Sequence, residues 1–169
     1  HSVELSRDRR RRLTKDGTGS LLNGILDWVY QEEIYGRGNF RGYWVRGDDA
    51  YLAYLQLDES PVPVYTIVNQ IPHHPPLEQT NYPKSGDPNP LVRIGIVAPD
   101  GGSTKWADLS RYADIEFLIS AVYWAPDGRL LFAVQDREQT WLDLNEADPR
   151  NGHTRVLIHE TTPAWVELM

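Results

Sequence analysis

The sequence predicts an all-β fold made of antiparallel four-stranded β-propeller blades, forming a partial propeller, with one short helix. Short segments rich in aromatic and β-branched residues alternate with turns of glycine, proline and aspartate, which is the pattern of strands joined by tight turns. The pattern recurs, because the offset that carries Val45 to Trp124 also carries Gln56 to Gln135. Recurring four-stranded units of about 40–45 residues are typical of propellers. A small β-sandwich is the alternative, and it does not predict an internal repeat.

The first half of the chain is predicted to contain an outer strand, a hairpin and a further strand. Residues 3–14 alternate and then turn, with the basic run 9–12 in the turn. The hairpin has strands at 42–45 and 51–57, which are rich in aromatic and β-branched residues. Residues 62–69 are the next strand candidate.

The second half is predicted to repeat the blade after a surface excursion. Residues 72–90 carry six prolines, which neither a helix nor a central strand accommodates. Strand character resumes at 91–97, before a Pro-Asp-Gly-Gly turn. The repeated unit is a four-stranded meander, with strands expected at 122–124, 130–135, 140–144 and 154–160.

These elements predict five consecutive parts of one propeller. The parts are the end of a preceding blade (1–22), a short helical Glu-Glu segment (23–38), a blade with a proline-rich insertion (39–110), a second blade (111–162) and the start of the next blade (163–169). With 169 residues, of which 40% are hydrophobic, the chain can bury a core. At about 40–45 residues per blade it is expected to be an open portion of a ring.

The helical segment carries the candidate binding residues. Asp27 is placed to cap a helix that ends at Gly36, and Glu32 and Glu33 stand near its predicted C-terminal end. Carboxylates cost about 0.3–1 kcal/mol at that end, because the last carbonyls already carry partial negative charge. Such a pair suits a cation, above all a primary ammonium. The alternative, which the spacing alone favours, is a solvated helix end with two idle acids.

Composition excludes several kinds of site. The net charge of −7 argues against a nucleic-acid partner, and no apolar run approaches the ~18 residues of a membrane span. The absence of cysteine excludes disulfides, thiolate metal sites and cysteine nucleophiles. It leaves the compartment open, exported (periplasmic or extracellular) or cytoplasmic. The histidines show no metal-ligand spacing and are expected at the surface, so we predict no metal and no cofactor.

Four motifs resemble the N-terminal propeller of the dipeptidyl peptidase IV family, which are prolyl oligopeptidase-like serine exopeptidases. They are Asp27-Trp28-Val29-Tyr30-Gln31-Glu32-Glu33, Leu52-Ala53-Tyr54-Leu55-Gln56-Leu57-Asp58, Tyr82-Pro83-Lys84-Ser85-Gly86-Asp87-Pro88-Asn89-Pro90 and Thr161-Thr162-Pro163-Ala164-Trp165-Val166. Two departures are visible: Val45 stands where a tryptophan usually follows Trp44, and Asp49 replaces a turn glycine. The resemblance implies an eight-bladed propeller joined to an α/β-hydrolase domain that carries a serine, aspartate and histidine triad.

The resemblance also implies a function for the glutamates. Glu32 and Glu33 would bind the free α-amine of a peptide substrate, with Asp27, Trp28 and Tyr30 supporting the motif. The parent protein would remove N-terminal dipeptides of the X-Pro or X-Ala type. No Gly-x-Ser-x-Gly elbow occurs in the sequence, so this chain is expected to be inactive alone. The alternative is a non-catalytic propeller interaction module from an inactive relative.

The resemblance predicts three partners. They are a peptide with a free N-terminus, the α/β-hydrolase domain of the same protein, and further copies of the chain through exposed blade faces. The last follows because an open propeller leaves apolar blade faces bare, and soluble monomers rarely expose more than a few hundred Å² of contiguous apolar surface.

Overall fold

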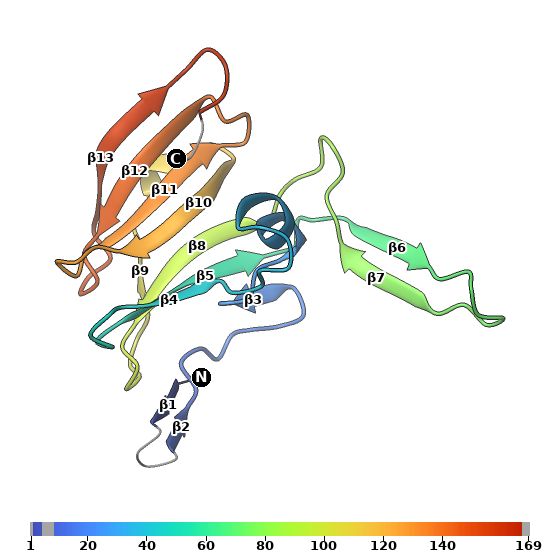
Figure 1. The fold of residues 1–169 in the computed structure, drawn as a ribbon, viewed down its shortest axis with the longest axis horizontal. Helices are drawn as coiled ribbons and strands as arrows, with labels where there is room; N and C mark the ends of the chain where they lie inside the picture. Colours follow the sequence, from blue (N-terminus) through green and yellow to red (C-terminus); the bar gives the residue numbers. More distant parts are fainter. Residues whose placement is uncertain (1, 5–8, 167–169) are drawn as a thin grey trace.

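The computed structural model describes residues 2–4 and 9–166, and it confirms an all-β, antiparallel architecture with little helix (Figure 1). Two larger sheets lie beside each other, and two small hairpins project from them. The first sheet contains β3 (Leu21–Asn23), β4 (Tyr43–Val45), β5 (Leu52–Asp58), β8 (Leu91–Val97) and β9 (Lys105–Trp106). The second contains β10 (Phe117–Trp124), β11 (Leu130–Asp136), β12 (Trp141–Ala147) and β13 (Thr154–Thr161).

The remaining elements are two hairpins and two short helices. The hairpins are β1 (Ser2–Glu4) with β2 (Arg9–Arg11), and β6 (Val64–Val68) with β7 (Leu77–Asn81). The helices are η1 (Tyr30–Ile34), a π-helix, and η2 (Ser110–Tyr112), a 3-10 helix. The prediction that the basic run forms a turn is wrong, because residues 9–11 pair with residues 2–4 as a strand. The segment before that run, residues 5–8, lies outside the described residues.

The inner edge of the first sheet is one strand broken in the middle. Both β3 and β4 pair with β5, end to end on the same side, so the sheet is four strands wide. The segment between them, residues 24–42, leaves this edge, forms η1 and returns. Figure 1 shows the helical turn beside the first sheet, near the second one.

The hairpin β6–β7 corrects the order of strands predicted for the first unit. The strand candidate at 62–69 does not join the sheet but pairs with β7, and β8 takes the place next to β5. Strand β7 was not predicted, because it lies between two clusters of prolines and the whole of residues 72–90 was expected to form a surface excursion. The prolines lie at the hairpin tip and after β7, so the stretch is the surface excursion expected from them, and it projects away from both sheets (Figure 1).

The second sheet is the predicted meander, in the order β10-β11-β12-β13. The repeat between the two units holds at the turn residues, where Asp49 and Gly128 both have positive φ, but the two connections differ in length by one residue. Val45 pairs with Leu52 across residues 46–51, whereas Trp124 pairs with Leu130 across residues 125–129. The offset therefore cannot fit both strands of each hairpin. It keeps the faces of the second strands, because Leu55 and Val134 lie in the same core cluster. It inverts those of the first strands, because Val45 is exposed whereas Trp124 packs against that cluster.

The core lies between the two sheets and includes the base of segment 24–42, which carries η1 and is called the helical excursion below. Leu55 and Ile94 of the first sheet and Phe132 of the second are completely buried in one cluster with Tyr30 of η1. The inner strands are joined directly, because the indole Nε1 of Trp124 donates to the carbonyl of Trp44 at 3.0 Å. The short helix η1 thus packs against both sheets. The division into five propeller parts stays a prediction.

Two glycines close the base of the helical excursion. The Gly24 N–H donates to the Leu55 carbonyl at 2.8 Å, and the Gly42 N–H donates to the Gly24 carbonyl at 3.1 Å. Gly24 has a φ of 69°, the left-handed region that costs other residues about 1–2 kcal/mol. A Cβ at Gly24 would meet nothing closer than 3.7 Å, so backbone strain is the only barrier to a side chain there.

We expect Gly24→Ala to lower the free energy of unfolding by about 1–2 kcal/mol, because alanine must adopt the left-handed conformation. Urea denaturation followed by tryptophan fluorescence measures the change. Gly19→Ala is the matched control, since no atom lies within 4 Å of the position that a Cβ would occupy there, and the φ of Gly19 is not positive. A loss at Gly24 no larger than that at Gly19 would contradict the role of Gly24 in closing the excursion.

Candidate functional site

The helical turn is fixed at its start by Asp27. The side chain of this buried residue accepts hydrogen bonds from the N–H of Val29 at 3.2 Å and of Tyr30 at 3.0 Å, as expected of a helix cap. The turn closes with a bond from the Tyr35 N–H to the Tyr30 carbonyl at 2.8 Å, the i→i+5 spacing of a π-helix. Glu32 and Glu33 stand in the first turn of this five-residue element. Because the helical residues begin at Trp28 and end at Ile34, the two glutamates also lie close to the C-terminal end of the helical segment, as predicted.

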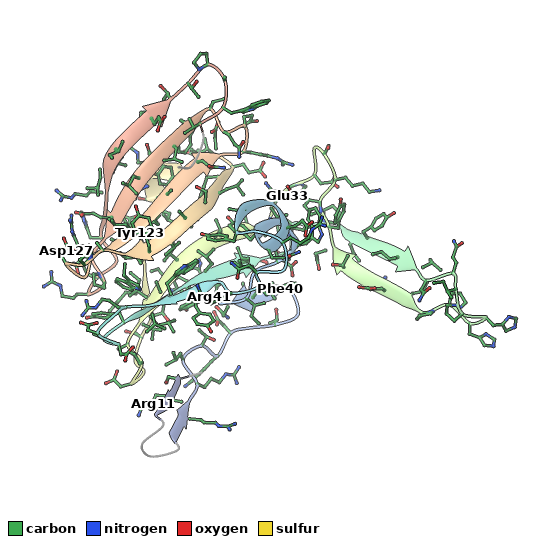
Figure 2. All side chains as sticks on the ribbon, viewed as in Figure 1. Arg11, Glu33, Phe40, Arg41, Tyr123 and Asp127 are labelled. Atoms are coloured by element: carbon green, nitrogen blue, oxygen red, sulfur yellow. The ribbon has the colours of Figure 1, made fainter. Side chains whose placement is uncertain are left out.

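The two glutamates have different surroundings. The side chain of Glu32 is 16% exposed and forms an ion pair with Arg37, whose Nε lies 2.5 Å from the Glu32 Oε1. Glu33, marked in Figure 2, is exposed, and its carboxylate has no partner among the side chains that the structure describes, those of residues 2 and 10–166. The hydrogen bond to Glu32, followed by the charges of Glu32 and Glu33, raises the pKa of the Arg37 guanidinium. The three side chains form a cluster with one net negative charge.

Sequence reasoning missed Arg37. The residue lies five positions after Glu32, in a glycine-flanked loop that we expected only to end the helix. A wide π turn brings the loop back over the helix, whereas an α-helical turn places the neighbours of Glu32 at three or four positions. The basic residue close behind two acids was the available signal.

The other side of the turn contacts the base of the β6–β7 hairpin. The ring of Trp28 meets that of Tyr82 edge-on, with centroids 4.3 Å apart, and Tyr82 lies 5.9 Å from Tyr65. The ammonium of Lys84 stands 4.7 Å above the Tyr65 ring. The double-glutamate motif and the Tyr-Pro-Lys motif, which are far apart in the sequence, therefore meet through aromatic rings.

A buried carboxyl group lies behind the helix cap. Glu59 follows β5 and is 8% exposed. Burial, and then the charge of Asp27, raises the pKa of Glu59 to about 7, and burial also raises the pKa of Asp27. Because Asp58-Glu59-Ser60 has the composition of an ordinary turn, the sequence carried no sign of this pairing.

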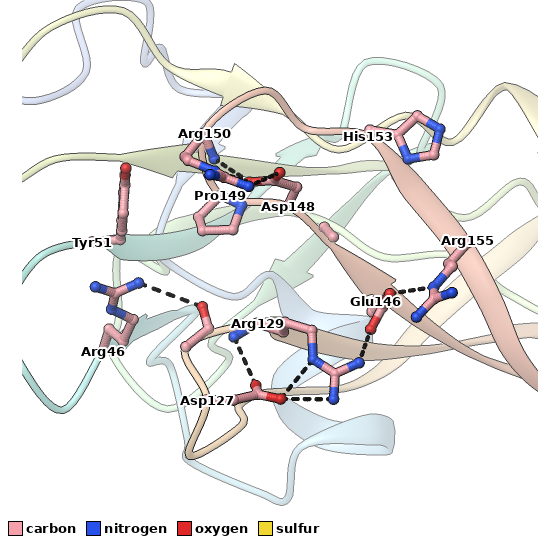
Figure 3. A pocket seen from close by; sticks show the side chains of 12 residues that line it. Arg46, Tyr51, Asp127, Arg129, Glu146, Asp148, Pro149, Arg150, His153 and Arg155 are labelled. Carbon is pink, nitrogen blue, oxygen red and sulfur yellow. Dashed lines mark hydrogen bonds and ion pairs between the residues drawn. The ribbon is translucent and has the colours of Figure 1, made fainter.

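A cavity of about 640 Å³ lies at the other end of β4, between the turns of the two sheets (Figure 3). Its arginines are paired with carboxylates: Arg129 with Asp127 at 2.7 Å, and Arg150 with Asp148 at 2.8 Å. Glu146 accepts from Arg129 and from one further arginine, as Figure 3 shows. Neither Glu32 nor Glu33 lines this cavity, so it is separate from the candidate amine site.

Other kinds of site are not found in the described part of the chain. Within residues 2–4 and 9–166, no helix has the length and apolarity to cross a membrane. The same residues contain no group of three or more histidine, cysteine, aspartate or glutamate side chains placed to hold a metal ion. The four histidines that the structure describes in the second half of the sequence and in the hairpin are exposed: His73, His74, His153 and His159.

Comparison with known protein families shows which family this chain belongs to. The family described as the dipeptidyl peptidase IV (DPP IV) N-terminal region matches residues 2–169. This chain belongs to the dipeptidyl peptidase IV family. The resemblance carried by the four sequence motifs is confirmed.

Curated relatives and solved structures agree. A probable dipeptidyl-aminopeptidase B of Ajellomyces dermatitidis is 33% identical over 172 residues, covering 92% of this chain and 19% of the relative. The relative from Penicillium rubens has the same identity and coverage. The crystal structure of Porphyromonas gingivalis dipeptidyl peptidase 4 superposes with a TM-score of 0.82 at 25% identity, covering 96% of this chain and 23% of that one. The chain thus spans about a fifth of the length of these relatives.

Proposed function

We propose that this chain is the substrate-recognition propeller portion of a serine dipeptidyl peptidase, and that Glu32 and Glu33 bind the free α-amine of the substrate. The nucleophile would lie in an α/β-hydrolase domain outside these residues. Membership of the dipeptidyl peptidase IV family supports the peptidase assignment, and relatives about five times longer are consistent with a further domain. The longer protein that joins this chain to such a domain is called the full-length peptidase below.

The observation that carries the amine site is that Glu33, which is exposed and has no partner among the described side chains, stands beside Glu32, which already binds a cation. Arg37 demonstrates that this turn accommodates a positive group beside both acids. A peptide α-amine has a pKa of about 7.7–8.0 and is mostly protonated at neutral pH. Each charge-assisted hydrogen bond to it contributes about 1.5–3 kcal/mol.

An anchored amine explains why the peptidase would release dipeptides and not longer or shorter fragments. With the N-terminus held at the glutamates, only the second peptide bond reaches a nucleophile at a fixed distance, and a longer substrate cannot slide inward. Asp27, Trp28 and Tyr30 support this anchor by capping the turn, by contacting the hairpin and by filling the core. Cleavage after X-Pro or X-Ala is the specificity that we propose. Self-association through exposed blade faces stays a prediction.

The test compares two chromogenic X-Pro substrates of the full-length peptidase, one with a free α-amine and one acetylated at that nitrogen. Acetylation removes the charge and two donors and leaves the scissile bond unchanged. A kcat/KM at least tenfold higher for the free amine is the result that supports the proposal. Equal values for the two substrates would overturn it.

A further inference from the structure

Two tyrosines attach the helical turn to a single residue of the second sheet. The N–H of Ile119 donates to the Tyr30 hydroxyl at 3.2 Å, and the Tyr35 hydroxyl donates to the Ile119 carbonyl at 3.1 Å. The two rings are stacked, with centroids 6.2 Å apart. Burial raises the pKa of both phenols above the ordinary value of 10.0, so both keep their protons at neutral pH.

Ile119 needs these partners because it lies on the open edge of its sheet. Strand β10 pairs with β11 on one side, and β4 approaches the other side only near its far end, at Trp124. In an antiparallel strand the N–H and C=O of one residue point to the same side. Ile119 is completely buried, so its backbone groups must find partners other than water.

The π-helical turn is what lets both hydroxyls reach one residue. In an α-helix, side chains five positions apart diverge by about 140° around the axis. The wider turn, closed by the bond from Tyr35 N–H to the Tyr30 carbonyl, brings positions 30 and 35 to the same side. Glu32 and Glu33 lie between these two positions in the chain, on the same turn.

We infer that Tyr35, together with Tyr30, is a positioning residue that fixes the Glu32–Glu33 turn relative to the second sheet. The inference rests on the proposed amine-binding function. Tyr35 is the residue to test, because it is only half-buried and its ring also packs on Trp44 with centroids 5.7 Å apart. Removing its hydroxyl leaves that packing in place and frees one end of the turn.

The experiment uses Tyr35→Phe in the full-length peptidase. We expect kcat/KM for the free-amine substrate to fall about three- to tenfold, as for loss of one neutral hydrogen bond, and that for the N-acetylated substrate to change less than twofold. Tyr54→Phe is the matched control. It also removes one hydroxyl contact, the 3.2 Å bond to Thr104, which comes directly before β9 of the first sheet. Both rates should remain at the parental level in this control.

The outcomes separate the positioning role from the function on which it rests. If the parental protein shows no preference for the free amine, the proposed function fails and the inference fails with it. If Glu33→Gln removes the preference but Tyr35→Phe retains it, only the positioning role is overturned. The same holds if Tyr35→Phe lowers both rates equally, since a general loss of folded protein acts on both substrates. In the variant that combines Glu33→Gln with Tyr35→Phe, kcat/KM for the free-amine substrate should fall by less than the product of the two single effects, because both changes would act on the same interaction.

Discussion

Glu33→Gln in the full-length peptidase is expected to lower kcat/KM for a free-amine X-Pro substrate about ten- to a hundredfold. The change removes one charge-assisted hydrogen bond of about 1.5–3 kcal/mol in the transition state. Glu32→Gln should cost less than Glu33→Gln, because Arg37 already occupies one Glu32 oxygen and shares its charge. Steady-state kinetics with both variants measures the order as well as the size of the losses.

The fold should survive these substitutions. Glu33 is exposed, and a surface change of this kind usually alters the free energy of unfolding by less than ~0.5 kcal/mol. The ion pair of Glu32 with the largely exposed Arg37 contributes little to stability, because surface ion pairs are weakened by solvent. Glu78→Gln, on the exposed strand β7, is the matched control and should leave kcat/KM unchanged. Parental activity in Glu33→Gln would contradict the amine-binding role and favour the alternative, in which the two acids are only solvated residues at the end of the helix.

The second large effect concerns stability and pH. Burial beside Asp27 raises the pKa of Glu59 from its ordinary 4.5 to about 7. The folded protein therefore keeps a proton that the unfolded chain releases, so the free energy of unfolding falls as pH rises from about 4.5 to about 7. Asp27, whose pKa is also raised, contributes in the same direction. The lowered pKa values of acids such as Asp48 and Asp148 lie near 2, so their loss of stabilisation occurs at lower pH.

Urea midpoints at pH 5 and pH 7 measure this effect with Glu59→Gln. Glutamine keeps the size of the side chain and cannot ionise, so the variant should match the parental protein at pH 5 and exceed its stability at pH 7. Glu78→Gln should follow the parental protein at both values, because that glutamate is exposed. A Glu59→Gln variant whose midpoint falls with pH as steeply as that of the parental protein would show that Glu59 does not keep its proton.

Most of the fold could be predicted from local patterns. The aromatic and β-branched strands of the second sheet, joined by Pro-Asp-Gly and Asp-Pro-Arg-Asn-Gly turns, form the predicted meander. The extra residue in the turn at 46–51 was not visible, since Asp49 adopts the positive φ that glycine has at Gly128. The repeat therefore looked continuous where the register slips. Periodicity finds strands, but pairing decides their register.

The site was predictable only in part. The motif around Glu32 and Glu33 is local, so it could be read from the sequence together with its Asp27 cap. The π-helical turn, the pairing with Arg37 and the burial of Glu59 depend on tertiary structure. The bonds from Tyr30 and Tyr35 to Ile119 span 89 and 84 residues, which no local pattern can indicate.

The central claim is that the two glutamates recognise the charge of a free α-amine. The most direct measurement is the ratio of kcat/KM for the free-amine and N-acetylated X-Pro substrates, in the full-length parental peptidase and in Glu33→Gln. If the claim is right, the parental ratio is at least tenfold, and it collapses toward one in the variant, because the substitution and the acetyl group remove the same interaction. A ratio that is as large in Glu33→Gln as in the parental protein would contradict it.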